Sequence, residues 1–327
     1  MSYNRENYIK VKKSYEGKNL RAKERAMALC DELHKLYPEL KEIDTALRQT
    51  GFKVFEASLM GKEGLEERLA LLKKQNMELQ QARGDFLEFK GYSRDYTDVK
   101  YECDLCKDVG SDDNGRMCSC MKKKLILEGY KSSGIGSLID KYTFDKFDIS
   151  YYSDTPGAKD NAGMVLEFCR KYAREFSDKT SRNVLLCGTT GLGKTHLSTA
   201  IAKEVIDRGF DVVYDTAQNV MQDFEDERFS KDYNSRNSEK KTDKYFECDL
   251  LIIDDLGTEM SNQFTVSCVY NIINTRINRE KPMIINTNLM QNELRERYAD
   301  RITSRLFGEF MPLVLTGKDI RAKKLFK

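Results

Sequence analysis

The sequence predicts an α/β protein in which a parallel sheet forms the C-terminal part and a mostly helical region precedes it. Short apolar runs recur in the second half of the chain, and helical patterns lie between them. In the first half, apolar residues recur at alternating spacings of four and three, which is the period of one helical face. The length of 327 residues fits two domains, at about 100–200 residues per domain.

The composition excludes several classes of protein. The 16 Phe and 17 Tyr supply a folded core, and only 4 Pro with 20 Gly argue against a fibrous or linker-rich chain. A formal charge of +2, from 55 basic and 53 acidic residues, lacks the basic balance of a dedicated nucleic-acid binder. No run approaches the roughly 20 apolar residues that span a bilayer, and the start lacks the apolar core of a secretory signal. We therefore expect a cytoplasmic protein without membrane association.

The N-terminal region predicts helices that meet at Pro38. Proline removes a backbone donor and disfavours helix at Tyr37, so a second helix should begin near Pro38. A further helix carries Asn76 on its apolar stripe. Two interpretations stay open: a bundle that packs on itself, or a partner-binding or coiled-coil face whose register Asn76 fixes. The stripes consist of Leu29, Leu33, Leu36, Leu40, Ile43 and Leu47, and then of Leu65, Leu69, Leu72 and Leu79.

Four cysteines follow these helices, as Cys103-x2-Cys106 and Cys118-x-Cys120. Cysteines of a cytoplasmic protein stay reduced, so their clustering indicates metal binding rather than disulfides. Paired thiolates on tight turns suit tetrahedral Zn²⁺, and four of them leave no open position, which predicts a structural site. The alternative is four unrelated buried cysteines. His34 is distant in sequence, and we interpret it as an ordinary side chain on a helix surface.

Domain boundaries follow from changes in composition. We assign residues 1–130 to a helical, four-cysteine zinc-binding domain, residues 131–160 to a linker and residues 161–327 to the second domain. Small residues followed by an aromatic cluster, over residues 122–162, are typical of a connector.

The segment after the first predicted strand has the spacing of a phosphate-binding loop. Val184–Cys187 predicts a buried strand, and a helical pattern follows the loop. The glycines allow backbone N–H groups to turn inward around phosphates at a helix N-terminus. Lys194 adds a charge for the β- and γ-phosphates, and Thr195 offers its hydroxyl to Mg²⁺. The predicted nucleotide-binding residues are Gly188, Thr189, Thr190, Gly191, Leu192, Gly193, Lys194, Thr195 and His196.

Acidic residues end a second apolar strand. Leu250–Ile253 predicts a central strand buried on both faces, and ligands of open α/β sheets bind at the carboxyl ends of the strands. We expect Asp254 to hold Mg²⁺, directly or through water, and Asp255 to orient the attacking water in phosphoryl transfer. The alternative, an acidic helix cap after a strand, explains one aspartate better than two.

A third strand and a row of arginines complete the pattern. The strand that begins at Pro282 ends in amides, which are able to report whether a γ-phosphate is present. The helix predicted next carries Arg297, Arg301 and Arg305 at spacings of four, so the three share one face. The row is either a solvated surface or the source of an arginine that acts on a transferring phosphoryl group across a subunit boundary.

These motifs together resemble the bacterial and phage replicative helicase loaders of the DnaC/DnaI type, which are AAA+ ATPases related to the initiator DnaA and to transposition helper ATPases. The resemblance covers residues 140–327 and rests on GTTGLGKTHL, LLIIDDLGTE, IINTNL, RITSRLF and GKDIR. It implies ATP as the ligand, Asn288 as the sensor 1 residue, Arg305 as the arginine finger and Arg321 as the sensor 2 residue. Residues 142–147 resemble the linker motif before the ATPase core.

The resemblance also implies partners. The N-terminal half is similar to the zinc-containing, helicase-binding domain of DnaI-type loaders, so residues 1–130 are expected to bind a hexameric replicative helicase. Single-stranded DNA is expected near residues 224–236, where basic and aromatic residues alternate, and an ordinary charged helix is the alternative. The ATPase domains are expected to associate, so that Arg305 of one copy completes the site of the next. Many AAA+ enzymes have Glu at the position of Asp255, and the shorter side chain implies slow, switch-like hydrolysis.

The sequence thus predicts an ATP-dependent loader of the replicative helicase onto single-stranded DNA in replication initiation. One alternative is a transposition helper ATPase of the IstB type, which shares the ATPase motifs and would serve a transposase. Another is a nucleotide-gated adaptor that does not hydrolyse ATP. A small-molecule kinase fits less well, because the arginine row suits a site shared between subunits.

Overall fold

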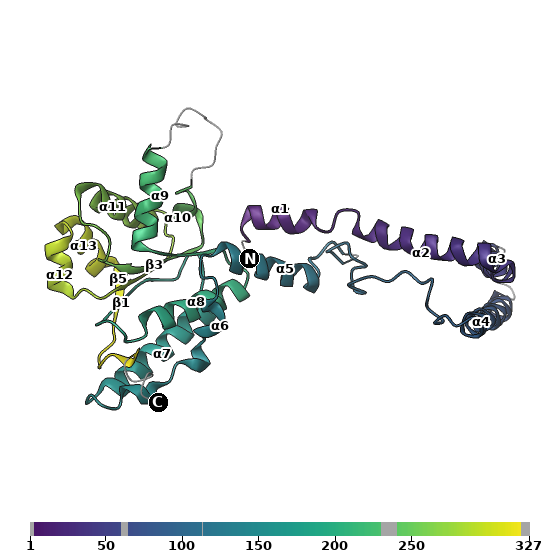
Figure 1. Ribbon diagram of the computed structural model, residues 1–327, viewed down its shortest axis with the longest axis horizontal. Helices are drawn as coiled ribbons and strands as arrows, with labels where there is room; N and C mark the ends of the chain where they lie inside the picture. Colours follow the sequence, from purple (N-terminus) through teal and green to yellow (C-terminus); the bar gives the residue numbers. More distant parts are fainter. Residues whose placement is uncertain (1–2, 60–64, 113, 230–240, 322–327) are drawn as a thin grey trace. The chain divides into compact units, whose positions relative to one another are not determined.

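The computed structural model describes residues 3–59, 65–112, 114–229 and 241–321 (Figure 1). It divides the chain into two compact units. One consists of Met1–Val11 with Ser119–Lys327, and the other of Lys12–Cys118. Within the described residues, no helix combines the length and the apolar character needed to cross a membrane.

The Lys12–Cys118 unit is built on three long helices, and its small apolar core lies where they meet. The predicted break is confirmed, because Pro38 is the first residue of a new helix, where its missing N–H costs nothing. Asn76 donates from Nδ2 to Thr50 Oγ1 at 2.9 Å, so it fixes a polar contact between two of the helices. The core consists of Leu33, Leu40 and Leu87. The helices are α2 (Lys18–Leu36), α3 (Pro38–Leu59) and α4 (Leu65–Phe89), and α1 (Arg5–Lys13) precedes them.

A five-stranded parallel sheet forms the centre of the other unit, in the order β2-β3-β4-β1-β5. The predicted parallel sheet is therefore confirmed, whereas the edge strand β5 was not predicted. Because all strands are parallel, their carboxyl ends lie along one edge of the sheet. The strands are β1 (Asn183–Cys187), β2 (Val212–Thr216), β3 (Leu250–Leu256), β4 (Met283–Thr287) and β5 (Phe310–Val314).

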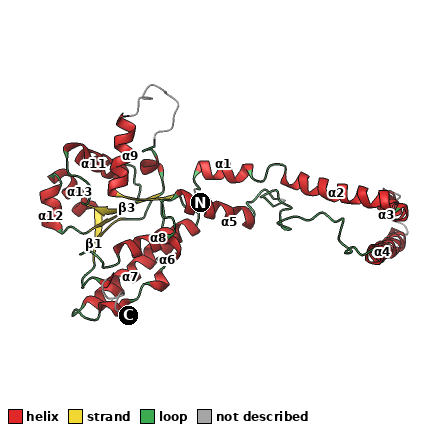
Figure 2. Cartoon of the chain, in the orientation of Figure 1, coloured by secondary structure: helices red, strands yellow, loops and turns green. Residues whose placement is uncertain are grey.

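Helices cover both faces of this sheet and give a three-layer α/β arrangement (Figure 2). One hydrophobic core includes Leu186 and Ile252 and lies against α7 (Ala158–Glu175) and α8 (Lys194–Asp207). The alternate residues of the same strands face a second core under the other helices. Those helices are α9 (Ala217–Phe229), α10 (Lys244–Glu247), α11 (Gln263–Asn278), α12 (Gln291–Arg297) and α13 (Asp300–Glu309).

The segment before α7 packs on the sheet unit. The predicted boundaries at residues 130 and 160 therefore differ from the division of the structure, which falls between Cys118 and Ser119. The reason is apolar burial, since Phe144 and Tyr152 belong to the same core as α8. The segment forms α5 (Ser119–Ser132), α6 (Leu138–Lys141), η1 (Phe144–Lys146) and η2 (Ile149–Tyr152).

The prediction of one helix carrying three arginines is wrong. The chain leaves α12 at Arg297 and begins α13 at Asp300, so Arg297 does not share a helix with Arg305. Tyr298 has extended backbone angles (φ −115°, ψ 145°) and is buried, with its hydroxyl bonded to Glu259. Burial of Tyr298 thus interrupts the four-residue period.

Candidate functional site: a phosphate-loop pocket

The loop between β1 and α8 has the predicted strand–loop–helix geometry. Gly193 immediately precedes α8 with a φ of 84°, a conformation that L side chains rarely adopt. A Cβ at Gly193 would lie 2.8 Å from Phe147 Cε2. Glycine is therefore required here both by backbone conformation and by the close approach of the aromatic residues before α7.

Lys194 opens α8 with its ammonium held by backbone and side-chain oxygens. Nζ donates to Gly188 O at 2.7 Å, to Thr189 O at 2.9 Å and to Asn288 Oδ1 at 2.6 Å. The side chain is buried, and this burial lowers the pKa of Lys194, although Asp255 and Asp254 act in the opposite direction. The structure thus brings together the lysine of the loop and the predicted sensor residue.

Asp254, at the end of β3, is buried and held by donors from other elements. Its Oδ2 accepts from the Tyr214 hydroxyl at 2.7 Å, and its Oδ1 accepts from Asn286 Nδ2 at 2.8 Å. Asn286 Nδ2 also donates to Ser198 Oγ at 2.7 Å. Tyr214 and Ser198 were not predicted, because only the pairing of β2 with β3 and the packing of α8 on the sheet bring them to the side chains around Asp254. Ser198 lies within α8 and Tyr214 in the middle of β2, and no pattern in the sequence singles out either of them.

Asp255 adopts an uncommon backbone conformation, with a φ of 54°. Burial and the neighbouring Asp254 raise the pKa of Asp255, and Lys194, Arg321 and Asn288 oppose them. Asn288 Nδ2 lies 3.5 Å from Asp255 Oδ1, so Asn288 joins Lys194 to Asp255. Strained, partly buried carboxylates are common where a protein positions a reacting group.

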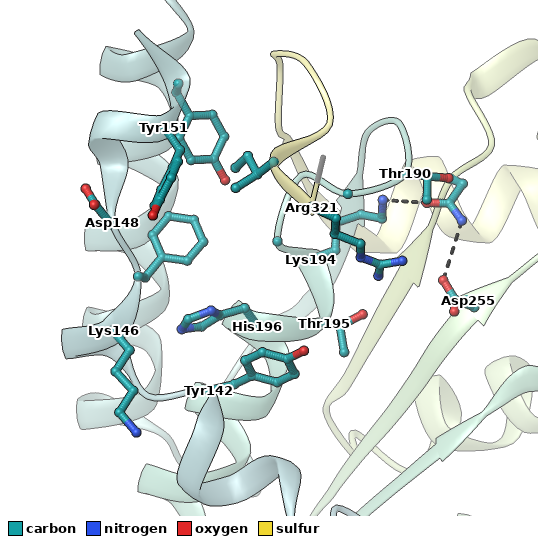
Figure 3. A pocket seen from close by; sticks show the side chains of 16 residues that line it. Tyr142, Lys146, Asp148, Tyr151, Thr190, Lys194, Thr195, His196, Asp255 and Arg321 are labelled. Atoms are coloured by element: carbon teal, nitrogen blue, oxygen red, sulfur yellow. Dashed lines mark hydrogen bonds between the residues drawn. The ribbon is translucent and has the colours of Figure 1, made fainter. Parts of the chain in front are cut away.

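Of these residues, Gly193, Lys194, Asp255 and Asn288 line a cavity of about 210 Å³ (Figure 3). Figure 3 shows Tyr142 and His196 side by side, with Lys194, Thr195 and Arg321 toward Asp255. The His196 ring lies 5.0 Å from the Tyr142 ring between centroids, and its Nε2 is 2.7 Å from Thr143 O. The cavity therefore has a polar, charged end and an aromatic end. Its full lining is Tyr142, Lys146, Phe147, Asp148, Tyr151, Tyr152, Thr190, Gly191, Gly193, Lys194, Thr195, His196, Asp255, Asn288, Ile320 and Arg321.

The C-terminal segment lies against the phosphate loop. The Ile320 N–H donates to Gly191 O at 3.1 Å, and a Cβ at Gly191 would lie 1.8 Å from Asp319 Oδ1. Asp319 also accepts from the Arg321 N–H at 2.8 Å. These contacts place Arg321 at the cavity, and the sensor 2 role that the resemblance implies for it stays a prediction.

The site has features that suit Mg²⁺. Thr195 lines the cavity, and Asp254 supplies a carboxylate at the same edge of the sheet. Asn286 Oδ1 is buried without a hydrogen-bond partner among the described residues, and it belongs to the side chain that contacts Asp254. Oxygen donors of this kind are the ligands, or the partners of ligating water, that Mg²⁺ prefers.

Arg305 lies outside the cavity. Its Nε and Nη2 donate to Asn274 Oδ1 at 3.0 and 2.8 Å, and the guanidinium carbon lies 4.9 Å from the centre of the Tyr270 ring. It is thus held on the surface formed by α11 and α13 and does not line the pocket of its own chain. Arg297 is committed to a different contact, with Glu259.

The four cysteines come together as the sequence predicted. Each cysteine offers one sulfur as a metal ligand. The four sulfur atoms all lie within 4.8 Å of one another, and they belong to Cys103, Cys106, Cys118 and Cys120. Cys103 Sγ and Cys118 Sγ are 3.8 Å apart, close to the edge of about 3.8 Å expected for a tetrahedron with Zn–S bonds of about 2.3 Å. The Gly110 N–H lies 3.4 Å from Cys106 Sγ. The donor set fits zinc.

The segment proposed to contact single-stranded DNA is described only in part. Residues 224–229 form the end of α9, and residues 230–236 lie outside the described residues. Phe224 packs against Tyr245 with ring centroids 6.2 Å apart, and the Arg228 guanidinium carbon lies 5.0 Å from the Phe264 ring centre. The described aromatic residue Phe224 therefore contributes to packing.

Comparison with known proteins agrees with this geometry. Residues 145–307 match the family described as IstB-like ATP binding protein. The chain is 28% identical over 143 residues to the replicative helicase loader DnaC of Escherichia coli (strain K12). This alignment covers 43% of the chain and 56% of DnaC. It is 27% identical over 186 residues to the chromosomal replication initiator protein DnaA of Aliarcobacter butzleri (strain RM4018). This second alignment covers 56% of the chain and 39% of DnaA.

A solved structure was also found, described as the crystal structure of the DnaC helicase loader. It aligns with a TM-score of 0.45 and 19% sequence identity, over 55% of this chain and all of that chain.

Proposed function

We propose that this chain, whose residues 145–307 form an AAA+ ATP-binding domain of the IstB/DnaC type, loads a replicative DNA helicase onto single-stranded DNA in an ATP-dependent manner. The observation that carries the proposal is the pocket in which Lys194, Asn288 and Asp255 form one connected row beside the phosphate loop. The similarity to DnaC supports the choice of helicase loading among the functions of such domains.

ATP would lie with its phosphates on the loop and its base at the aromatic end of the cavity. Phosphate oxygens would replace the carbonyl oxygens that Lys194 Nζ contacts, and backbone N–H groups at the start of α8 would bind the remaining oxygens. Tyr142 and His196 offer ring faces for the base. Thr195 and Asp254 would hold Mg²⁺, which would supply positive charge for the β- and γ-phosphates.

Hydrolysis would depend on Asp255 as the residue that orients water. Its carboxylate lines the cavity, and Asn288 contacts it while also contacting Lys194. Loss of the γ-phosphate would therefore alter the contacts of both Lys194 and Asp255, because the Asn288 amide bonds to each of them. We expect slow, switch-like turnover, because an Asp reaches less far than the Glu found in many related enzymes.

Self-association would complete the site. Arg305 does not line the cavity of its own chain, and Asn274 and Tyr270 hold its guanidinium in place on the surface. An arginine fixed in this way can approach the phosphates bound by a neighbouring copy. Arg321 would act within the chain, since it lines the same cavity as Lys194.

The helical N-terminal part, residues 1–130, would hold Zn²⁺ through the four cysteines and bind the helicase. Exposed apolar side chains of its helices, such as Phe52 and Phe89, are available for a partner. Reduced, zinc-holding cysteines suit action in the cytoplasm, as we propose.

A loading assay tests this function. The full chain, the replicative helicase of the same organism and circular single-stranded DNA would be combined with ATP, and helicase retained on the DNA would be measured. We expect retention that needs ATP and falls at least tenfold with Lys194→Ala. Gly163→Ala is the control, because a Cβ at that helical position meets nothing within 4 Å. No ATP-dependent retention of helicase would contradict the proposal.

The same purified chain, assayed for DNA binding and ATP turnover, distinguishes the two alternative functions. Binding to duplex DNA with no helicase contact would favour a transposition helper, which the match to the IstB-like family supports. Nucleotide binding without turnover, with and without single-stranded DNA, would favour a nucleotide-gated adaptor.

A further inference from the structure

We propose that Cys30, His34 and Asp44 form a second metal site, of the kind that takes Zn²⁺, separate from the four-cysteine cluster. The three residues lie in the helical Lys12–Cys118 unit, and one ligand atom of each lies within 4.8 Å of the others. The site is independent of the proposed function, because it concerns metal binding by the N-terminal helices alone.

The distances between the ligand atoms match one face of a coordination tetrahedron. Cys30 Sγ is 3.5 Å from His34 Nε2 and 3.7 Å from Asp44 Oδ2. Bonds of about 2.3 Å to sulfur and about 2.0 Å to nitrogen or oxygen predict tetrahedral edges of about 3.5 Å between sulfur and either atom. His34 Nε2 and Asp44 Oδ2 are 2.7 Å apart, and a separation of about 0.6 Å more would make room for the ion.

Two helices bring these ligands together. Cys30 and His34 are four residues apart on α2, so their side chains point to the same side of that helix. Asp44 is in the second turn of α3, which Pro38 begins directly after α2. Ligands carried by regular helices on either side of a turn stay close together, and small side-chain rotations are enough to open the His34–Asp44 distance for an ion.

Arg83 of α4 orients the carboxylate. Its Nε donates to Asp44 Oδ1 at 2.7 Å, whereas the oxygen that faces Cys30 and His34 is Oδ2. Arg83 also donates to Thr97 Oγ1, which fixes the guanidinium. Carboxylate ligands of metals are commonly held by such outer contacts, so the arginine supports one oxygen and leaves the other for the ion.

The small core of this unit gives the site a structural purpose. Among the described side chains, the apolar cluster at the helix junction contains three fully buried residues, Leu33, Leu40 and Leu87. Small cores often depend on a metal for stability. A metal at Cys30, His34 and Asp44 would tie α2 to α3 one turn away from Leu33 and Leu40.

A catalytic thiol explains the cluster less well. His34 uses the same nitrogen, Nε2, toward Cys30 and toward Asp44. In a nucleophilic cysteine site the orienting carboxylate and the thiol lie at different ring nitrogens. The shared nitrogen instead suits three ligands that converge on one point.

Metal counting in the full chain tests the site. We expect about two Zn²⁺ per chain by elemental analysis after purification in the presence of zinc, with one lost in Cys30→Ala and the other lost in Cys106→Ala. Glu32→Gln, an exposed position on the same helix, is the matched control and should keep both ions. An unchanged zinc content in Cys30→Ala would overturn the proposal.

Two substitutions of one residue separate a metal ligand from a structural ion pair. His34→Cys keeps a zinc ligand but not the imidazole contact with Asp44, and we expect it to retain the second ion. His34→Gln keeps a hydrogen-bond donor but no suitable ligand, and it should lose the ion. Loss of the second ion in His34→Cys and its retention in His34→Gln would show that Cys30, His34 and Asp44 form only a hydrogen-bonded cluster. So would a wild-type zinc content that is lost in Cys106→Ala and unaffected by the substitutions at Cys30 and His34.

Cobalt(II) gives a second readout that does not depend on stability. Five thiolates would bind cobalt in the wild type, four from the cluster and one from Cys30. The thiolate-to-cobalt absorption should therefore fall by about one fifth in Cys30→Ala. Circular dichroism would show that each variant keeps its helices, and an undiminished cobalt band in a folded Cys30→Ala would also overturn the proposal.

Discussion

Among single residues, Tyr214 shows how a buried hydroxyl supports the carboxylate of the nucleotide site. It donates to Asp254 Oδ2 and also lies 3.2 Å from Ser198 Oγ. Burial and the neighbouring Asp254 raise the pKa of Tyr214 well above its ordinary value, so the hydroxyl keeps its proton at neutral pH. The donor is therefore available whenever Asp254 is ionised.

Tyr214→Phe is expected to destabilise the protein by about 1–3 kcal/mol, because it removes one donor from a buried carboxylate. The effect of Mg²⁺ on nucleotide affinity should fall as well, since Asp254 loses its orientation. Urea unfolding and nucleotide titrations with and without Mg²⁺ measure both. Tyr8→Phe, at an exposed position of α1 outside the cavity, is the control. Equal unfolding curves for Tyr214→Phe and the wild type would contradict the assignment.

Asp255 combines an uncommon backbone conformation with a raised side-chain pKa, at the position proposed to orient water. Its raised pKa means that the folded state binds a proton more tightly than the unfolded state does. The contribution of Asp255 to stability is thus most favourable at low pH and is lost as the pH rises through the raised pKa. At neutral pH the ionised side chain costs stability.

Asp255→Asn should therefore raise the midpoint of thermal unfolding at neutral pH by a few degrees, about 1 kcal/mol, while it abolishes turnover. Asn tolerates the backbone conformation at φ 54°, so that strain is unchanged. The gain should shrink as the pH falls through the raised pKa of Asp255, because the wild-type carboxyl then takes up its proton. Calorimetry at several pH values measures it, and a gain that does not vary with pH would refute the explanation.

At the scale of elements, the nucleotide site depends on contact between the phosphate loop and the segment before α7. Phe147 approaches Gly193, and the Tyr152 hydroxyl donates to Leu192 O at 2.6 Å. His196 contacts the same segment through Thr143 O. The aromatic end of the cavity therefore comes from His196 of α8 together with residues 142–152, which the sequence predicts as a linker.

Gly193→Ala tests this contact. A Cβ there would meet Phe147 and would occupy a backbone region that disfavours L side chains, so we expect nucleotide affinity to fall at least tenfold. Gly163→Ala within α7 should instead keep affinity and add about 0.5–1 kcal/mol of stability, because Ala favours helix. Fluorescent-nucleotide binding and urea unfolding distinguish the two. Wild-type affinity in Gly193→Ala would show that the loop adjusts freely.

At the scale of the whole molecule, the position of Arg305 outside its own pocket suggests activity that requires more than one copy. Lys194→Ala subunits have an intact arginine, and Arg305→Ala subunits have an intact phosphate loop. Each variant alone should lack turnover. If Arg305 acts on a neighbouring copy, a mixture assembles some complete sites.

An equal mixture of Lys194→Ala and Arg305→Ala should recover about one quarter of wild-type turnover, since a complete site needs one subunit of each kind in order. ATP hydrolysis as a function of mixing ratio measures this. An arginine that acts within its own chain predicts no recovery at any ratio. Arg301→Ala, which changes an exposed side chain, is the control.

The sequence by itself determined the phosphate loop, the two aspartates, the four cysteines and the helix break at Pro38. Each of these depends on residues close together in the chain, where spacing alone specifies the local geometry. The structure places the loop with Lys194 at the same cavity as Asp255 of β3 and Asn288 after β4, and the roles of these residues stay predictions.

Only the tertiary structure decided which distant residues surround those motifs. Tyr214 and Asn286 contact Asp254 because β2, β3 and β4 pair in one register, and Ser198 of α8 joins them through the Asn286 amide. Asp44 contacts His34 because α2 and α3 meet at Pro38. The burial of Tyr298 ended a helix that the arginine spacing had predicted as continuous. Such contacts arise from burial and strand pairing between segments far apart in the chain, and no local spacing encodes them.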